Sequence, residues 1–270
     1  MSGGAPADAA GTPPAPRARK PRYSVSVRRV AKLTPRMVRV TFDGEALEGF
    51  IWNGPAAHLK LIFGEPAADR PSSDNPPRPI MRTYTPRRFD AATRELEVDF
   101  VIHGTGPASD WAAQAAPGQT LTLAGPGRSY AVDPAADWYL LVGDDTAIPA
   151  ICTILEALPA AAPKRVLLEV ADASEEHPLD APLANAELTW LRRGEDAVRA
   201  GRALEAAVRA LDPPAGSGRV YVACEAGAMR RIRQHLLHDR ALPREHLVTR
   251  GYWKLGETDH PDRDYGEDVL

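Results

Sequence analysis

The hydrophobic pattern changes near residues 132–137, and this change constrains the fold more than any other feature of the chain. Before it, short alternating apolar runs separated by Gly, Pro and Asn clusters predict strands, with one short helical stretch at 108–115. After it, continuous apolar runs such as 138–144 alternate with helical segments such as 146–158. We therefore expect an N-terminal six-stranded antiparallel β-barrel, followed by a parallel-sheet domain of the kind that binds nucleotides.

The two ends of the chain differ in composition from these two domains. The first residues are mostly Ala, Pro and Gly and cannot bury a core, whereas the last are rich in Asp and Glu. This composition predicts a disordered tail over 1–20, a barrel domain over 21–132, a second domain over 137–256 and an acidic tail over 257–270. The acidic tail is expected to be solvated, with folding over a cofactor cleft as the alternative.

Composition limits the cellular context of the protein. The formal net charge is -3, no apolar run reaches the length of a membrane span, and the N-terminus does not read as a signal peptide. Cys152 and Cys224 lie in apolar runs and predict buried, reduced thiols. His235 and His238 lack a third ligand, so no metal site is predicted. We expect a cytoplasmic monomer that does not associate with membranes.

A basic segment from Arg17 to Arg39 contains nine Lys or Arg residues and no acid. It leaves open a nucleic-acid-binding arm, which would bind DNA in a salt-dependent way. The same residues alternate apolar and basic side chains on either side of Thr34–Pro35, which favours two strands with Arg on the solvated face. No nucleic-acid partner is therefore expected.

The stretch "IMRTYTPRRFD" (80–90) concentrates guanidinium, aromatic and hydroxyl groups in the barrel half of this acidic chain. Arg82 can neutralise a diphosphate, Tyr84 can pack against a planar ring, and Thr85 can hydrogen-bond a ring heteroatom. The segment "HGTGPASDWA" (103–112) adds glycines and a helix start that suit a diphosphate. Together these groups indicate a flavin dinucleotide, whereas each segment alone is compatible with an ordinary connection.

The second half carries signals for a second nucleotide. In "VGDDTAIPA" (142–150), Gly143 permits a tight turn and Thr146 can cap the following helix, although two adjacent acids oppose a phosphate and no GxGxxG motif is present. Asp172 and Glu175 suit a ribose 2′-hydroxyl, whereas Arg192 and Arg193 suit a 2′-phosphate. The balance leans slightly to NADPH over NADH.

Four motifs in order make the chain resemble the siderophore-interacting proteins, which are FAD-dependent ferric-siderophore reductases of the ferredoxin-reductase superfold. The motifs are "MRTYTPR", "DFVIHGTGPASDWA", "GDDTAIPAI" and "RGYWKLGE", and the resemblance spans roughly residues 22–256. It implies an FAD-binding barrel followed by an NAD(P)H-binding domain.

The resemblance also implies roles for individual residues. Those expected to hold FAD are Arg82, Thr83, Tyr84, Thr85, Asp99, Val101, His103, Ala108, Ser109 and Trp111, with Asp144 and Thr146 approaching from the second domain. Those expected to attract an anionic ferric siderophore are Lys60, Arg128 and Lys254. Two positions depart from the family pattern: "GPGRS" (125–129) displaces Arg128 by one residue, and Asp145 stands where Glu is more usual.

The activity implied by the resemblance is reduction of Fe(III) in a ferric siderophore by NAD(P)H through FAD, with release of Fe(II) for iron assimilation. No side-chain acid or base is required for this electron transfer. Two alternatives stay open: a ferredoxin- or flavodoxin-linked flavin reductase of the same superfold, for which reduced ferredoxin would be a partner, and a flavin-free module that only binds siderophore.

Overall fold

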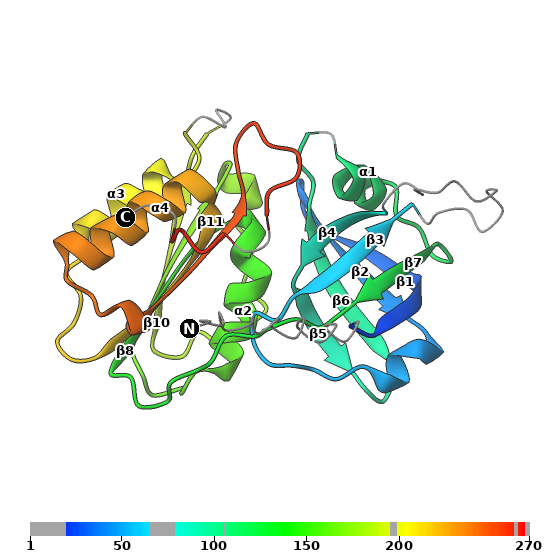
Figure 1. Cartoon of the computed structure of the whole chain (residues 1–270), viewed down its shortest axis with the longest axis horizontal. Helices are drawn as coiled ribbons and strands as arrows, with labels where there is room; N and C mark the ends of the chain where they lie inside the picture. The colour runs from blue at the N-terminus through cyan, green and yellow to red at the C-terminus, as the bar shows by residue number, and fades with distance from the viewer. Residues whose placement is uncertain (1–19, 65–78, 105, 195–198, 262–263, 268–270) are drawn as a thin grey trace, which may run out of the picture.

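The computed structural model describes residues 20–64, 79–104, 106–194, 199–261 and 264–267. Two sheets lie beside one another, an antiparallel one built from the first half of the chain and a parallel one from the second (Figure 1). The predicted disordered tail lies outside the described residues except for Lys20. The fold class expected from the sequence is confirmed, and the arrangement is that of the ferredoxin reductase-like fold.

The antiparallel sheet has seven strands in the described part of the chain, in the order β4-β3-β7-β1-β2-β6-β5. The strands are β1 (Arg22–Thr34), β2 (Met37–Asp43), β3 (Leu59–Phe63), β4 (Ile80–Tyr84), β5 (Pro86–Asp90), β6 (Glu95–Val101) and β7 (Thr120–Ala124). Strands β4 and β5 lie at opposite edges, yet only Thr85 separates them along the chain. The sheet must therefore curl until its two edges meet at Thr85, which makes a half-barrel.

The expectation of six strands was one short. Proline cannot donate to a sheet ladder, so Pro86 disfavours a strand that continues through it. In the structure Pro86 begins β5, which pairs with β6 on the other edge of the sheet. An edge strand tolerates proline at its first residue, so the chain changes edge at this position rather than leaving the barrel.

The barrel core confirms the alternation in the sequence. Val25, Val27, Val40 and Phe42 are buried in one cluster, which is closed by helix α1 (Pro107–Ala113) and the 3-10 helix η1 (Glu45–Gly49). The basic residues of this region lie on the outer face, where Arg29, for example, pairs with acids of β6. These cross-strand ion pairs support the prediction of strands over that of a nucleic-acid arm.

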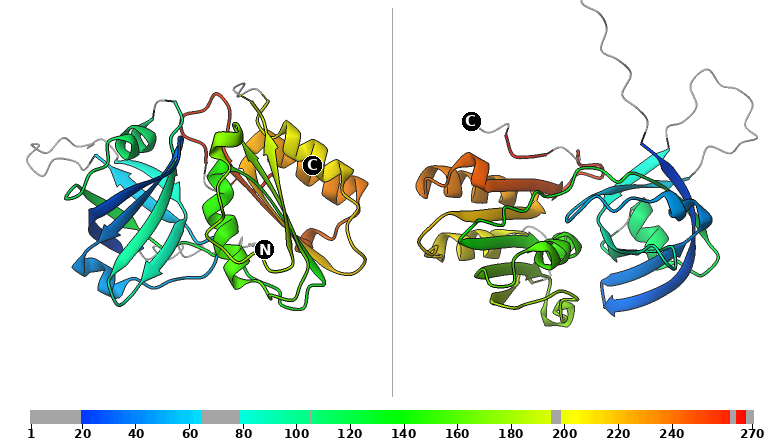
Figure 2. Two further views of the ribbon diagram at one scale, coloured as in Figure 1. Left: turned by 180° about the vertical axis from the view of Figure 1, so that it is seen from behind. Right: turned by 90° about the horizontal axis from the view of Figure 1, so that it is seen from below.

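The parallel sheet has the order β10-β9-β8-β11-β12. Its elements are β8 (Trp138–Asp144), η2 (Asp145–Ala147), α2 (Ile148–Ala157), β9 (Lys164–Val170), η3 (Ala173–Glu175), β10 (Ala186–Arg192), α3 (Arg202–Ala210), β11 (Gly218–Glu225), α4 (Ala226–Gln234), the π-helical turn η5 (His235–Asp239), η6 (Arg244–His246) and β12 (Leu247–Trp253). Helix α2 covers the face toward the barrel, and α3 and α4 cover the other face (Figures 1 and 2).

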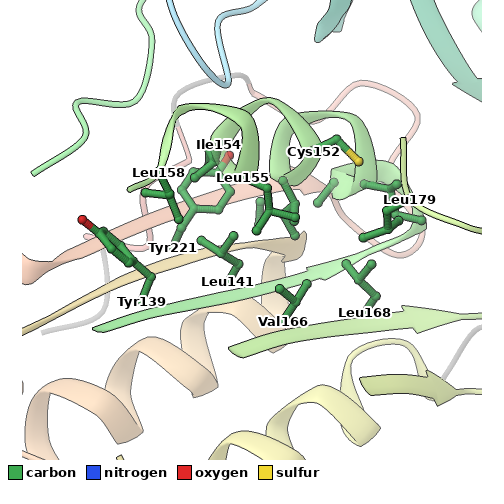
Figure 3. Packing of buried hydrophobic residues seen from close by; sticks show 14 of the residues in the cluster. Tyr139, Leu141, Cys152, Ile154, Leu155, Leu158, Val166, Leu168, Leu179 and Tyr221 are labelled. Atoms are coloured by element: carbon green, nitrogen blue, oxygen red, sulfur yellow. The ribbon is translucent and has the colours of Figure 1, made fainter. Parts of the chain in front are cut away.

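Helix α2 is buried on nearly every side because it fills the space between the parallel sheet and β5. Figure 3 shows its residue Leu155 packed above Leu141 and Val166 of the sheet, and Cys152 further along the same helix. Both cysteines are buried and free, as the sequence predicts. An apolar helix of this kind cannot be solvated on either face, so it packs against both domains, and its cluster includes Met37 of β2.

Polar contacts add to this interface between the domains. Arg87 of β5 is 1% exposed and lies 2.9 Å from Glu156 of α2, and its guanidinium also donates to the Asp180 carbonyl. On the same side, the Thr34 hydroxyl donates to Glu175 of η3 at 2.5 Å. These contacts fix the edge of the parallel sheet against β1, β2 and β5.

The C-terminal residues differ from the expectation of a solvated tail. Beyond β12 the chain arches toward the barrel and returns along the second domain (Figure 1). Asp264 is buried, its carbonyl accepts from the Gly251 amide, and the Thr249 hydroxyl donates to the Tyr265 carbonyl at 2.6 Å. Within the described residues, none of the helices has both the length and the apolarity to span a bilayer.

Candidate functional site

The candidate site lies where β4 of the barrel meets the carboxyl end of β12. The Thr85 side chain, which is buried, hydrogen-bonds the hydroxyl of Tyr252 in β12. Tyr252 in turn shares a hydrogen bond of 2.9 Å with the Tyr221 hydroxyl, and burial raises the pKa of both phenols. In an α/β sheet, ligands bind beyond the carboxyl ends of the strands. The contact therefore places the predicted flavin motif, Arg82 to Thr85 at the end of β4, beside the carboxyl edge of the parallel sheet.

Arg82 forms the outer lip of this junction. Its guanidinium donates to the Met81 carbonyl at 2.9 Å and to the Thr258 carbonyl at 3.1 Å, and lies 3.2 Å from the Asp259 carboxylate. The side chain is one-quarter exposed. Arg82 thus lies between the barrel and the C-terminal segment.

Tyr84 and Thr83 occupy opposite faces of β4. Tyr84 pairs with Leu59 on the core face, and its ring packs 4.5 Å from Phe100. Burial raises the pKa of the Tyr84 phenol well above its usual range, so it stays protonated. Thr83 pairs with Lys60 of β3 on the outer face. Phe100 therefore holds the ring of Tyr84 from the core side of the sheet, which suits a residue that supports a planar ligand.

The segment before α1 has the features expected of a diphosphate site. The N-cap residue Gly106 has no side chain, its amide donates to the Asp110 carboxylate at 3.2 Å, Pro107 occupies the start, and Ala108 and Ser109 are buried. The Ser109 hydroxyl accepts from the His103 amide at 3.1 Å, whereas the His103 side chain is exposed. Trp111 differs from its expected role, because its indole packs with Phe42, Phe63 and Phe100 inside the end of the barrel.

Asp99 and Val101 are also placed differently from the expectation. Both oxygens of the Asp99 carboxylate accept from Arg39, at 2.6 and 2.9 Å, and the carboxylate is buried in that bidentate pair. Val101 is half-buried and packs against the core of the second domain. Their side chains belong to the domain interface, so neither is available as a direct contact for a ribityl chain.

Asp144 connects the ends of three strands. Its carboxylate accepts from the Thr146 amide and hydroxyl, the Glu225 amide and the Trp253 indole, at 3.1, 2.5, 2.9 and 2.8 Å. Burial, together with the charge of Asp145, raises the pKa of Asp144 to about 7. The sequence assigned the helix cap to Thr146, but Asp144 is the capping residue and Thr146 donates to it.

Gly143, which is predicted to permit a tight turn, has a packing role in the structure. A Cβ at this position would lie 2.7 Å from Ala147 Cβ, 2.7 Å from Ile151 Cδ1 and 3.1 Å from the Ala223 carbonyl. The residue is buried beneath α2, so no ligand reaches it. The glycine is required because β8, β11 and α2 approach closely there.

The predicted nucleotide residues lie at the carboxyl ends of β9 and β10. Asp172 accepts from the Ser174 amide and hydroxyl at 2.7 and 2.6 Å, and these bonds lower its pKa. Arg192 pairs with Glu176 at 2.6 Å, and Arg193 pairs with Asp145 at 2.8 Å. Both guanidiniums therefore meet acids of this chain. Glu175 is buried against Thr34 and is not a ribose contact.

Sequence reasoning missed a pocket of about 530 Å³ at the carboxyl end of β11. It is lined by Ala200, Arg202, Glu205, Glu225, Gly227, Arg231 and Leu255. Arg202 and Gly227 lie at the starts of α3 and α4, whose first amides donate to the carboxylates of Glu169 and Glu225. The guanidinium of Arg202 is therefore the group in the pocket that suits a pyrophosphate. The "CEAGAM" turn (224–229) after a buried strand was the available signal.

Four cations form a cluster that we call the basic mouth. They are Lys20, Lys60, Arg82 and Arg250. The pKa of His58 falls to about 4 because the ring is buried and because Lys20, Lys60 and Arg250 surround it. Of the predicted docking residues, Lys60 belongs to this cluster and the Arg128 backbone hydrogen-bonds His58. Lys254 instead pairs with Glu257. Lys20 and Arg250 were not predicted as docking residues because the local pattern around each indicates only the start or the end of a strand.

The structure explains the "GPGRS" departure. A Cβ on Gly127 would lie 1.9 Å from Nε2 of His58, so only glycine fits beneath that ring. The Gly127 amide donates to the His58 carbonyl at 2.7 Å, which holds the two segments together. Arg128 must therefore follow the glycine rather than precede it.

The fold and the site define a two-domain protein with a flavin-type barrel and a nucleotide-binding sheet. Residues 26–130 match the family model "Siderophore-interacting FAD-binding domain", and residues 136–256 match "Siderophore-interacting protein". The chain belongs to the siderophore-interacting protein family.

Two relatives and one solved structure illustrate this membership. The chain is 33% identical to the ferric vibriobactin reductase ViuB of Vibrio cholerae, over 84% of this chain and 87% of that protein. It is 32% identical to the NADPH-dependent ferric-chelate reductase of Escherichia coli, over 85% and 91% of the two chains. A siderophore utilization protein from T. fusca is 38% identical, with a TM-score of 0.79 and coverage of 91% and 97%.

Proposed function

We propose that the protein is an FAD-dependent reductase that transfers electrons from NAD(P)H to Fe(III) in ferric siderophores and releases Fe(II). The observation that carries the proposal is the contact between Thr85 of the flavin motif and Tyr252 at the end of β12. It joins the barrel edge to the carboxyl edge of the sheet, where a flavin and a nicotinamide ring can lie face to face.

The donor set at this junction fits FAD. Arg82 supplies a guanidinium at the lip, Thr85 a hydroxyl at the junction, and the first turn of α1 supplies backbone amides. Tyr84, held by Phe100, supplies an aromatic edge. Bound FAD supplies the conversion of a two-electron donor into single-electron steps. The chain's own residues orient the two ligands and exclude water, and none acts as a proton donor.

Two further regions receive the reactants in this proposal. The pocket beside Arg202 and Gly227 takes the pyrophosphate of NAD(P)H, and similarity to the NADPH-dependent ferric-chelate reductase of E. coli supports NADPH as donor. The basic mouth attracts an anionic ferric complex although the chain carries a formal net charge of -3. Lowering the charge of iron weakens its bonds to hard oxygen ligands, so Fe(II) leaves the chelate.

The proposal is tested by Fe(II) formation. FAD-loaded protein is mixed with NADPH or NADH and a ferric siderophore, and Fe(II) is trapped by a chromogenic chelator. We expect Fe(II) to form with nucleotide and to be absent without FAD or nucleotide. Failure of the loaded protein to form Fe(II) with either nucleotide, while reduced ferredoxin succeeds, would replace the proposal with a ferredoxin-linked reductase.

A further inference from the structure

The C-terminal segment brings one carboxylate to the basic mouth. The Asp259 side chain is 77% exposed and lies 3.2 Å from Arg82. Asp259 also acts on Lys60, since its charge raises the pKa of that ammonium while burial, Lys20 and Arg82 lower it. A single acid thus faces at least two cations of the mouth.

The position of Asp259 is fixed by contacts on both sides of it. The neighbouring Thr258 carbonyl accepts from Arg82 at 3.1 Å. His260, the next residue, is nearly buried, and its Nε2 lies 2.8 Å from the Asp264 carboxylate. Asp264 is itself held by Arg230 at 2.8 Å. The carboxylate of Asp259 therefore projects from an anchored stretch of chain rather than from a free end.

The basic mouth is the place where an anionic ligand would otherwise meet unscreened positive charge. His58 contributes no charge near neutral pH because its pKa is about 4. The charge balance of the mouth is thus set by the cations and by Asp259, among the described residues whose charges act on Lys60. The negative charge of Asp259 repels an incoming anion and lowers the positive charge of the mouth that attracts it, whereas a neutral ligand is little affected.

We propose that Asp259 is a specificity-determining residue that sets how much negative charge the ferric complex at the basic mouth carries. The proposal rests on the function proposed above. Asp259 lowers the affinity for highly anionic complexes, such as tris-catecholates, and leaves the affinity for neutral complexes, such as trihydroxamates, nearly unchanged. It is not a catalytic residue, because its carboxylate acts through the charges of Arg82 and Lys60.

The test compares wild-type, Asp259→Asn and Asp259→Lys proteins, all loaded with FAD to equal flavin content. Binding is followed by tryptophan fluorescence with redox-inert gallium(III) complexes, one trianionic tris-catecholate and one neutral trihydroxamate. Steady-state reduction of the matching ferric complexes gives KM and kcat. Asp212→Asn makes the same charge change at an exposed residue at the opposite end of the parallel sheet, and serves as control.

For Asp259→Asn we expect roughly 3-fold to 10-fold tighter binding of the trianionic complex, a similar fall in its KM and little change in kcat. Asp259→Lys should extend the effect, and both variants should bind the neutral complex within about 2-fold of wild type. Equal effects on both complexes, or none, would overturn the assignment of Asp259. If wild-type protein reduces neither ferric complex, the proposed function fails instead, and the gallium binding data still decide the role of Asp259.

Discussion

The indole of Trp253 donates to the buried carboxylate of Asp144 at 2.8 Å, and so ties the end of β12 to the end of β8. The two residues are 109 positions apart in the chain. Since Tyr252 precedes Trp253 and contacts Thr85, this hydrogen bond also fixes the strand end that faces the flavin motif. The geometry of the candidate site therefore depends on a contact within the second domain.

Asp144 should make stability fall as pH rises. Its pKa is about 7 in the fold and about 3.8 when exposed, so the folded state binds a proton more tightly than the unfolded state between these values. Its favourable contribution is complete below about pH 4 and is lost as pH rises through 7. Asp144→Asn should flatten the dependence of the unfolding free energy on pH over this range, measured by urea denaturation. An unchanged slope would contradict the raised pKa.

Arg82 should dominate retention of the flavin. Arg82→Ala removes the guanidinium at the lip of the junction, and we expect the Kd for FAD to rise about 10-fold to 100-fold because a charge-assisted contact is lost. Quenching of FAD fluorescence measures the Kd. Arg88→Ala is the matched control, since Arg88 is exposed and pairs with Asp180 at the other edge of the barrel. Equal losses in both variants would argue against the assigned site.

Arg87 should be the most important ionic residue for joining the domains. Arg87→Ala leaves Glu156 without its partner and opens a gap beside α2, so we expect a loss of about 3 kcal/mol in the unfolding free energy. Arg88→Ala breaks only a surface pair and should cost less than about 1 kcal/mol. Thermal and urea denaturation compare the two. Similar small losses would show that the apolar contacts of α2 hold the domains together alone.

Glu176 should limit selection of NADPH. It pairs with Arg192 at 2.6 Å, and Glu176→Gln would free that guanidinium for a 2′-phosphate. We expect the KM for NADPH to fall about 3-fold while that for NADH stays within about 1.5-fold. Glu187→Gln, which breaks the Arg165 pair at the other end of β10, is the control. If the KM values for both nucleotides shift together, Arg192 does not contact the 2′-phosphate.

Local patterns in the sequence were sufficient to predict the strands and the division into two domains. Alternation placed Val25, Val27 and Phe42 in one core because a half-buried strand shows its inner face at every second residue. The missed strand β5 shows the limit of this reasoning. Pro86 disfavours a continuing strand, but only the curvature of the complete sheet reveals that a new edge begins there.

The site could be predicted in part, because motif residues lie close together in the chain. The prediction of Arg82, Tyr84 and Thr85 as one group depends on this closeness. The contact of Arg82 with Thr258, 176 residues away, could not be read from any local pattern. Glu175 shows the converse error: its place after a strand suits a ribose contact, yet it is buried against Thr34, 141 residues away. Long-range packing decides which acids stay exposed.

Absorbance spectra of the purified protein under anaerobic conditions would test whether bound FAD carries electrons from NAD(P)H to a ferric siderophore. The spectrum is recorded before and after NADPH or NADH, and again after a ferric siderophore is added in the presence of an Fe(II) chelator. If the protein is such a reductase, the flavin bands should bleach with nucleotide and return with the ferric complex as Fe(II) is trapped. A protein that binds no flavin, or whose flavin bands do not return with the ferric complex, would contradict it.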